Sequence, residues 1–510
     1  MSDAARACCC GLALAIAGCQ GEPSADEAPT GTGSTSEAPE PTGSEGTGGD
    51  SSSGDGESSG DASSSGEPDE PVDCDDEDRV YAPPPVMVDG ELAVPIDVLS
   101  LAGEFTFDFA AQTTRARAEL RFRVGPVEGR PIFDLRQDGA IVGSLDGAAI
   151  DGSGMPQRDL GGGPGSEMRV LATALPACSE HLLVLEYPIE VLVGYAAPPP
   201  EFKEDGVAWD FGFGDLTPRT FLEQWLPANL IHDRHPITLG VTIDGGPADQ
   251  RVISNGPVVE LAPGRWQVEF PGSSTAQSPM LVLIPGARVE SSSTTVTLPD
   301  GEYGIELHRR IEVDVSSAAL HDSLAQSFAA FTASTGGYAF SGFTAVIDFN
   351  GGMEYDGGTV SSVEALPHEL FHSWYGRGIR PARASDGWFD EAWNEYNTAF
   401  PLFPAEPIAA DAPPAVLCSD NPWSRTTPFT AYDEGRAVFA AIADAAGVAP
   451  LRASMQAFYA AHVLEPVSTQ ELERHLHCSL DVPAVRELFH RRVYGKQGAA
   501  PAVPDGYCEP

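Results

Sequence analysis

The segment His368-Glu369-Leu370-Phe371-His372 places two histidines four positions apart. Residues i and i+4 of a helix lie on one face, so both imidazoles can reach the same metal ion. Glu369 is offset from that face, where it can hydrogen-bond a water beside the metal without being a ligand. Pro367 requires the helix to begin close to this point, because proline in a helix interior removes a backbone hydrogen bond. The alternative is a chance match, with two surface histidines on a helix.

A third candidate ligand lies downstream. Eighteen residues separate His372 from Glu391, which lies in the segment Trp388-Phe389-Asp390-Glu391-Ala392-Trp393-Asn394-Glu395-Tyr396. Two histidines, one glutamate and one open position are the arrangement of a hydrolytic zinc site. We therefore expect one Zn²⁺ per chain, bound by His368, His372 and Glu391. Glu395 lies one helical turn beyond Glu391, where it is either a hydrogen-bond acceptor for a ligating imidazole or a solvated carboxylate.

These motifs resemble those of the gluzincin zinc metallopeptidases, in particular the aminopeptidase N family. Upstream of the histidines, Gly351-Gly352-Met353-Glu354-Tyr355 is similar to that family's GAMEN motif. Downstream, Tyr432-Asp433-Glu434-Gly435 is similar to the motif that carries its catalytic tyrosine. In the first half of the chain, Trp225-Leu226-Pro227-Ala228-Asn229 and Ser254-Asn255-Gly256 resemble strands of its saddle domain. The resemblance covers about residues 100 to 500.

The resemblance implies a zinc aminopeptidase that releases N-terminal residues from peptides. In such an enzyme Glu369 is the general base, and Tyr432 is the residue that we expect to donate to the oxyanion. Glu354, together with Gly352 and Met353, is implied to bind the substrate, with the carboxylate of Glu354 on the free α-amine. The alternative for Tyr432 is a buried aromatic residue with a satisfied hydroxyl, and the alternative for Glu354 is likewise a purely structural role.

The chain departs from the family at two motifs, which leaves other functions open. The family has Asn-Glu-Gly where this chain has Asp390-Glu391-Ala392, and GAMEN ends in Asn where this chain has Tyr355. An endopeptidase is one alternative. A glycyl-type aminopeptidase is another, indicated by His372-Ser373-Trp374 and Ile379-Arg380-Pro381. A catalytically inactive lipoprotein that presents a binding surface is the third. We expect the family's C-terminal helical-repeat domain to be missing, which predicts a more open cleft.

Residue patterning predicts a multidomain α+β fold. Residues 74–300 are expected to form an N-terminal antiparallel β saddle or sandwich. In Arg115–Val124 five apolar residues alternate with charged ones, which predicts a half-buried strand. Shorter apolar runs lie between turns rich in glycine and proline, at Leu182–Leu185, Gln267–Phe270 and Met280–Ile284.

Residues 301–510 are expected to form an α-rich, thermolysin-like metallopeptidase domain. Leu320, Leu324, Phe328 and Phe331 recur at helical spacing. Ser468-Thr469-Gln470-Glu471 is a capping box at the start of another helix.

The N-terminus predicts export. Residues 1–19 contain a short apolar run, Gly11–Ala17, and end in Ile16-Ala17-Gly18-Cys19, which resembles the lipobox of bacterial lipoproteins. Cys19 would then be lipidated, and the protein would be an outer-membrane lipoprotein at the cell surface or in the periplasm. The alternative is an ordinary cleaved signal. Residues 20–73 are expected to be a disordered acidic linker, because they contain almost no large apolar residue.

The formal net charge of −46 argues against nucleic acid or an anionic membrane surface as a partner. Eighteen acidic residues and no Lys or Arg lie between Gln20 and Asp78, so the rest of the chain keeps a charge of −28. We expect peptides as partners, and a membrane contact only through the lipid anchor. The sequence indicates neither an oligomeric state nor a cofactor beyond the metal.

Five cysteines follow the signal segment, and they are too far apart for a cysteine zinc site. An oxidising compartment would let them form disulfides, and their odd number leaves at least one without a partner in this set. The sequence does not indicate which of them pair. They are Cys74, Cys178, Cys418, Cys478 and Cys508.

Overall fold

The computed structural model describes residues 74, 80–190, 192, 198–216, 218, 220–349, 351–398, 408 and 412–509. The signal segment with Cys19 and the linker up to residue 73 lie outside the described residues, so export, lipidation and linker disorder stay predictions. Among the described residues no single helix is long and apolar enough to cross a membrane; one pair bent by 118°, Phe429–Ala446 with Val448–Ala461, meets the test only when taken together.

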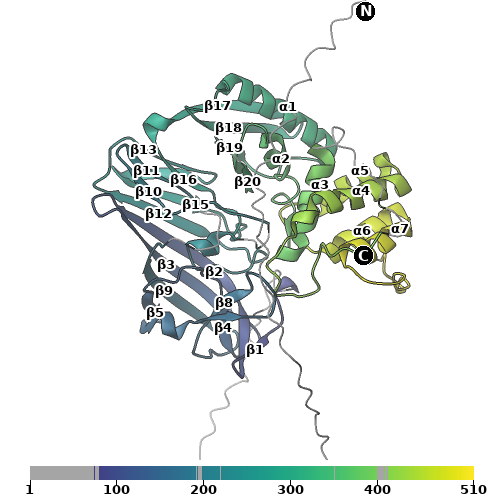
Figure 1. Cartoon of the computed structure of the whole chain (residues 1–510), viewed down its shortest axis with the longest axis horizontal. Coiled ribbons are helices and arrows are strands. Elements are labelled where there is room, and N and C mark those ends of the chain that lie inside the picture. Colours follow the sequence, from purple (N-terminus) through teal and green to yellow (C-terminus); the bar gives the residue numbers. More distant parts are fainter. Residues whose placement is uncertain are drawn as a thin grey trace, which may run out of the picture. The chain divides into compact units, whose positions relative to one another are not determined.

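The first part of the described chain is rich in strands and forms two sheets (Figure 1). The larger sheet has twelve strands among the described residues, with β14-β15-β12-β2-β3-β9-β5-β6 as its main path, and the smaller has the order β10-β11-β16-β13. The larger sheet comprises β1 (Val86–Val88), β2 (Glu91–Asp108), β3 (Thr113–Val124), β4 (Arg130–Phe133), β5 (Val142–Leu145), β6 (Ala148–Asp151), β7 (Gln157–Asp159), β8 (Glu167–Val170), β9 (Glu180–Pro188), β12 (Ile237–Asp244), β14 (Val258–Ala262) and β15 (Arg265–Phe270). The smaller sheet comprises β10 (Glu201–Lys203), β11 (Gly206–Asp210), β13 (Gln250–Ser254) and β16 (Leu281–Pro285).

The predicted strands are confirmed, but the purely antiparallel arrangement is wrong. The run 115–124 lies in β3, and the three shorter runs lie in or overlap β9, β15 and β16. Strand β2 pairs with β3 in antiparallel fashion, yet with β12 and β4 in parallel fashion. The sheet is therefore mixed, because strands distant in the sequence take places on either side of β2. Period-two alternation reports which face is buried and carries no information about strand direction.

The second part contains a five-stranded sheet and seven α-helices among the described residues (Figure 1). The sheet order is β17-β18-β19-β21-β20. Its strands are β17 (Val289–Leu298), β18 (Gly301–Arg310), β19 (Gly342–Ile347), β20 (Gly352–Tyr355) and β21 (Gly358–Ser361), and a short parallel pair is formed by β22 (Arg380–Pro381) and β23 (Pro466–Val467). The helices are α1 (Ser317–Thr335), α2 (Leu366–Phe371), α3 (Trp388–Thr398), α4 (Asp433–Ala446), α5 (Val448–Ala461), α6 (Thr469–Leu480) and α7 (Ala484–Leu488).

A sheet-rich part followed by a helical part confirms the predicted α+β organisation. The amphipathic run of leucines and phenylalanines lies in α1, where Leu320, Leu324 and Phe328 are buried. Ser468 caps α6 through the predicted reciprocal box with Glu471. The sequence pattern did not reveal the five-stranded sheet, and the domain boundary predicted after residue 300 falls in the turn of its β17–β18 hairpin.

Strand β20 connects the two cores. Its alternate residues Met353 and Tyr355 are buried in the core of the sheet-rich part, although β20 itself pairs with β21 of the five-stranded sheet. Successive side chains of a strand point to opposite faces, so Gly352 and Glu354 face the other way. The same short strand therefore packs against one core and presents its other face to the helices that follow.

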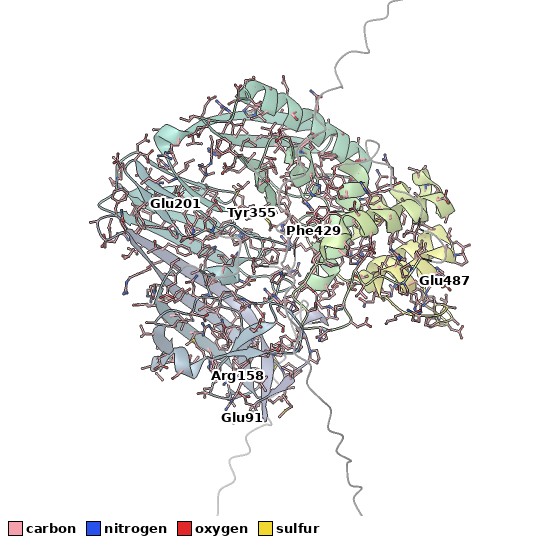
Figure 2. The ribbon with its side chains drawn as sticks, in the orientation of Figure 1. Glu91, Arg158, Glu201, Tyr355, Phe429 and Glu487 are labelled. Atoms are coloured by element: carbon pink, nitrogen blue, oxygen red, sulfur yellow. A yellow bond between two sulfur atoms is a disulfide. The ribbon has the colours of Figure 1, made fainter. Side chains whose placement is uncertain are left out.

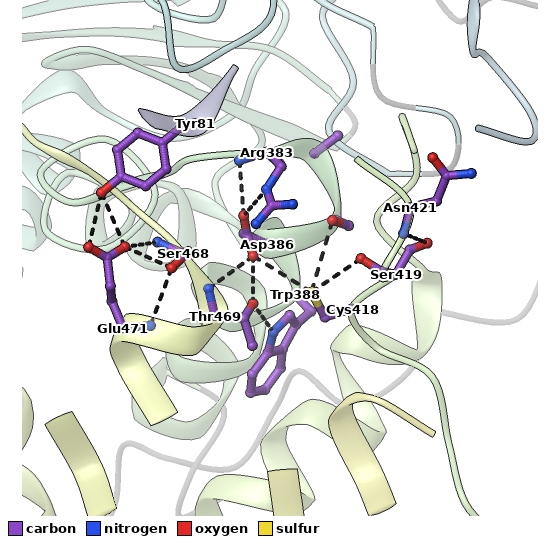
Figure 3. A network of polar contacts seen from close by, with 12 residues as sticks. Tyr81, Arg383, Asp386, Trp388, Cys418, Ser419, Asn421, Ser468, Thr469 and Glu471 are labelled. Atoms are coloured by element: carbon purple, nitrogen blue, oxygen red, sulfur yellow. Dashed lines mark hydrogen bonds and ion pairs between the residues drawn. The ribbon is translucent and has the colours of Figure 1, made fainter. Parts of the chain in front are cut away.

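The position of α3 depends on a buried carboxylate, that of Asp386 (Figure 3). Asp386 Oδ1 accepts hydrogen bonds from the backbone N–H of Thr469 (2.9 Å) and from its hydroxyl (2.7 Å). The indole of Trp388, the first residue of α3, donates to the same hydroxyl at 3.0 Å. These bonds join the start of α3 to the start of α6, which fixes the helix that carries Glu391.

Two disulfides join four of the five cysteines, Cys74 to Cys178 and Cys478 to Cys508. Cys418 is buried with a free thiol. The expectation that an odd cysteine stays outside the disulfides is confirmed, and the pairing that the sequence left open is now assigned.

This pairing can be tested by alkylation. In urea without reductant, iodoacetamide should label Cys418, and the other four cysteines of this set should react only after reduction, as read by peptide mass mapping. In native buffer Cys418 should react slowly, because its side chain is buried. Labelling of Cys178 or Cys478 before reduction would contradict the assignment.

Candidate metal centre

The three predicted ligands converge on one point. His368 and His372 approach through their Nε2 atoms, 3.2 Å apart, and Glu391 Oε2 lies 3.4 Å from the first and 3.6 Å from the second. Tetrahedral zinc with bonds of about 2.0–2.2 Å to nitrogen and oxygen separates its ligand atoms by about 3.3–3.5 Å. Glu391 Oε2 is buried and has no hydrogen-bond partner among the described residues. The donor set and its spacing therefore fit a zinc ion.

Helix α2 is short because of its sequence. Pro367 stands in its first turn, where a missing N–H costs nothing, and the helix ends at Phe371 with His372 as its C-cap. Because α2 begins at Leu366, Pro367 lies at the start of the helix, as the sequence analysis required. His372 N still reaches His368 O at 3.4 Å, so both imidazoles lie on one face one turn apart.

The Nδ1 atom of each histidine ligand, on the ring side away from the metal point, has an oxygen neighbour that orients the ring. His368 Nδ1 lies 3.4 Å from Glu395 Oε1, which favours the first of the two alternatives for Glu395, a hydrogen-bond acceptor for a ligating imidazole. His372 Nδ1 lies 3.2 Å from the carbonyl oxygen of Tyr375, an acceptor that the sequence analysis missed because it is a backbone atom. Asn394 adds a third restraint by donating to His368 O at 2.8 Å. Such contacts fix the tautomer and the direction of a ligating imidazole.

Carboxylates crowd the centre. Oxygen atoms of Glu391, Asp215 and Asp390 lie within 4.8 Å of one another, and so do ligand atoms of Glu354, Glu369 and His372. Burial, followed by the charge of Asp215, raises the pKa of the Glu391 carboxyl well above its usual range. Burial also raises the pKa of Glu369 to about 7, although His368 acts against it. A divalent cation at the triad would offset this concentration of negative charge.

Glu369 and Gly352 lie against each other. A Cβ atom on residue 352 would stand 2.0 Å from Glu369 Oε1, so only glycine leaves room for this carboxylate. Gly352 thus shapes the site through its missing side chain. Met353 is buried in the core of the sheet-rich part, so its side chain provides packing at this position.

Glu354 is buried and held by an arginine that the sequence analysis did not select. Arg377 Nη2 lies 2.8 Å from Glu354 Oε1, and the same guanidinium donates to Glu354 O at 3.3 Å. Both side chains are almost fully buried. Burial raises the pKa of Glu354 well above its usual range, and Arg377 opposes that shift. No local motif singled out Arg377, because the partner that explains it lies 23 residues away.

Tyr432 lies beside the first ligand, at the start of α4. Its ring stacks on His368 with the centroids 5.9 Å apart and the planes at 22°. Gly435 permits this position, because a Cβ there would stand 2.6 Å from the Cβ of Ala392 in α3. Figure 2 labels Phe429, which precedes Tyr432 by three residues in the sequence, and Tyr355, which follows Glu354.

The segment that leads to Tyr432 is anchored in the sheet-rich part. Arg425 Nη2 lies 2.6 Å from Glu223 Oε1 and 3.3 Å from Asp134 Oδ2, and Arg136 lies 2.7 Å from the same Asp134 atom. All four side chains are buried. Two acids and two bases balance the buried charge, and the loss of one would leave the others unpaired.

No family model matches the sequence, and no curated protein matches it. Solved structures do match. An M1 zinc metallopeptidase of Deinococcus radiodurans bound to a Tyr-Ser-Ala substrate has a TM-score of 0.57 and 16% identity, over 80% of this chain and 96% of that one. In fold, this chain resembles the M1 zinc metallopeptidases.

Two further structures agree with that fold. Legionella pneumophila aminopeptidase A, in complex with aspartic acid, has a TM-score of 0.59 and 13% identity, over 78% of this chain and 49% of that one. Yeast LTA4 hydrolase, in complex with bestatin, has a TM-score of 0.58 and 12% identity, over 80% of this chain and 69% of that one. At these identities the likeness establishes the fold, and the function is argued from the site.

The site predicts stoichiometric zinc. Purified protein should contain about one zinc per chain by elemental mass spectrometry, and His372→Ala should lose it, whereas the control His181→Ala in β9 should keep it. Glu395→Ala should weaken zinc affinity by about 10–100-fold, because it removes the acceptor behind His368. Added zinc should raise the melting temperature of the stripped protein. Absence of stoichiometric metal, or retention of zinc by His372→Ala, would contradict this assignment.

Proposed function

We propose that this chain hydrolyses peptide bonds with zinc and acts as an aminopeptidase on the free N-termini of peptides. The observation that carries the proposal is the set of groups around the triad. Glu369, Tyr432 and Glu354 come from three separate elements and surround the same three ligands. The fold shared with M1 zinc metallopeptidases supports zinc chemistry and peptide hydrolysis.

Zinc held by His368, His372 and Glu391 would act as a Lewis acid and lower the pKa of water to about 7. Glu369 would accept the proton of the attacking water and then deliver it to the leaving amine. Its carboxylate lies beside Gly352 of β20, and the missing side chain of that residue leaves room for it.

Tyr432 is the proposed donor to the oxyanion that forms when water attacks the scissile carbonyl. Its ring stacks on that of His368, so Tyr432 lies beside the first ligand. A hydrogen-bond donor that is held in place before the reaction stabilises developing charge without reorganisation. The anchoring of the preceding segment by Arg425 helps to hold Tyr432 there.

Glu354 is the proposed partner of the substrate's α-amine. Arg377 holds and balances its carboxylate, and a protonated amine would offset the further negative charge of Glu369 and Asp215 nearby. Asp215 brings a second carboxylate to the same centre from the segment after β11. An enzyme that uses these groups to bind an amine requires a free N-terminus, which separates this proposal from an endopeptidase.

The catalytic role is tested with Glu369→Gln. The variant should keep its zinc and lose about 10²–10⁴-fold in kcat, because the amide cannot transfer the proton. Glu364→Gln is the matched control, since that residue is exposed and lies five positions upstream. Zinc content and cleavage of a fluorogenic aminoacyl amide are measured together. A zinc-loaded wild type without hydrolysis would favour the inactive binding protein, and a near-normal rate in Glu369→Gln would exclude Glu369 as the base.

Specificity is tested by comparing free and N-acetylated forms of one peptide. The wild type should cleave the free form and leave the acetylated form intact. Glu354→Gln should reduce kcat/KM for the free peptide by about 10–100-fold, the usual worth of a charged hydrogen bond. Glu302→Gln, at an exposed position of β18, serves as the control. Equal cleavage of both peptides would show an endopeptidase and end the role given to Glu354.

A further inference from the structure

We propose a second ligand site, separate from the metal centre, that binds a small organic monocation with an apolar body. It is a cavity of about 430 Å³ between the sheet-rich part and the five-stranded sheet. Small-molecule sites commonly occupy about 300–1,000 Å³ and lie where domains meet. None of the three zinc ligands, nor Glu369 or Tyr432, lines it.

The walls of the cavity are partly aromatic. Phe340, which precedes β19, and Leu464 line it with partly exposed side chains, whereas Phe270 and Phe343 border it while their side chains are buried in the two cores. Gly304 on β18 also lines the cavity and has no side chain. A Cβ built there meets nothing within 4 Å, so this position borders open space. The cavity therefore combines an apolar lining with room for a ring-sized group.

The charged groups of the cavity are mainly acidic. Glu269 on β15 and Glu306 on β18 are exposed, and Asp356 is partly buried. The single lining base, Arg380, is only 1% exposed and pairs with Asp356 at 2.6 Å. Its guanidinium also donates to Ser273 O at 2.7 Å, which joins two segments that line the cavity. Three acids and one base leave two negative charges over the cavity.

This combination selects one class of ligand. An ammonium or guanidinium group would be attracted to Glu269 and Glu306, and its apolar part would pack against Phe340 and Leu464. An anion of the same shape would be repelled, and a neutral molecule would gain only the apolar contact.

The cavity is close to the metal centre along the chain but distinct from it. Asp356 follows β20 directly, two residues after Glu354, and Asn255 donates to Asp356 O at 2.7 Å. Arg377 pairs with Glu354, whereas Arg380 pairs with Asp356. Two separate buried ion pairs therefore mark the two sites, and a ligand can be assigned to one or the other by mutation.

Binding of phenethylamine to the zinc-loaded full chain tests the proposal by titration calorimetry at low salt. Phenethyl alcohol and 3-phenylpropionate are the neutral and anionic controls of matched shape. The amine should bind, and both controls should bind at least about tenfold more weakly. Equal binding of all three compounds would overturn the charge selection.

Variants locate the bound amine. Glu306→Gln should weaken binding by about threefold, as for an exposed ion pair, and Glu302→Gln on the same strand should not. In the Glu354→Gln background, Gly304→Val should weaken the remaining binding because its side chain projects into the cavity, whereas its melting temperature should match that of Glu354→Gln alone.

Glu354→Gln separates this site from the metal centre. Because this change weakens the amine site proposed at the metal centre, the binding of phenethylamine that remains in zinc-loaded Glu354→Gln measures the second site alone. Binding that is lost in Glu354→Gln and retained in Gly304→Val would place the amine in the metal centre and overturn the proposal.

Discussion

The convergence of two imidazoles and one buried carboxylate on a single point is the constraint on which the rest of this structure depends. Three ligand atoms 3.2–3.6 Å apart must come from α2 and α3, so the two helices have to pack in one relative position. The bond from Asn394 to His368 O fixes that position locally. The Asp386 network fixes it from the far side, by tying the start of α3 to α6. Much of the polar structure beneath the site thus serves to hold Glu391 in place.

Strand β20 is the second determinant, because it belongs to the site and to the junction between the two parts. Met353 and Tyr355 pack in the core of the sheet-rich part, whereas Gly352 and Glu354 face the metal centre. A strand has two faces, and here each face serves a different core. The segment Ser254-Asn255-Gly256, which resembles a saddle-domain strand, contributes to the same junction. Asn255 bonds to the backbone just beyond β20 and holds that strand against the sheet-rich part.

Electrostatics set the character of the site. Buried carboxylates are costly unless they are paired, and this chain pairs them with buried arginines, Arg377 with Glu354 and Arg425 with Glu223. The carboxylates nearest the triad have raised pKa values, as expected where burial and like charge act together. A divalent cation is the natural complement to such a centre. The chain carries a net charge of −46, but the electrostatics of the metal centre are set by its buried carboxylates.

The sequence by itself determined the metal triad, the strand at β3 and the helices α1 and α6, because each depends on a spacing of a few residues or a known motif. It left the acceptor role of Glu395 open, and the structure places Glu395 behind His368. Tertiary structure alone decided the mixed sheet, the disulfide pairs, and the roles of Asp215 and Arg377. These depend on contacts between distant segments, such as β2 with β12, which leave no periodic trace in the sequence. Local patterns record which face of an element is buried. They do not record which segment packs against that face. At this site such segments supply Arg377 beside Glu354 and Asp215 beside Glu391.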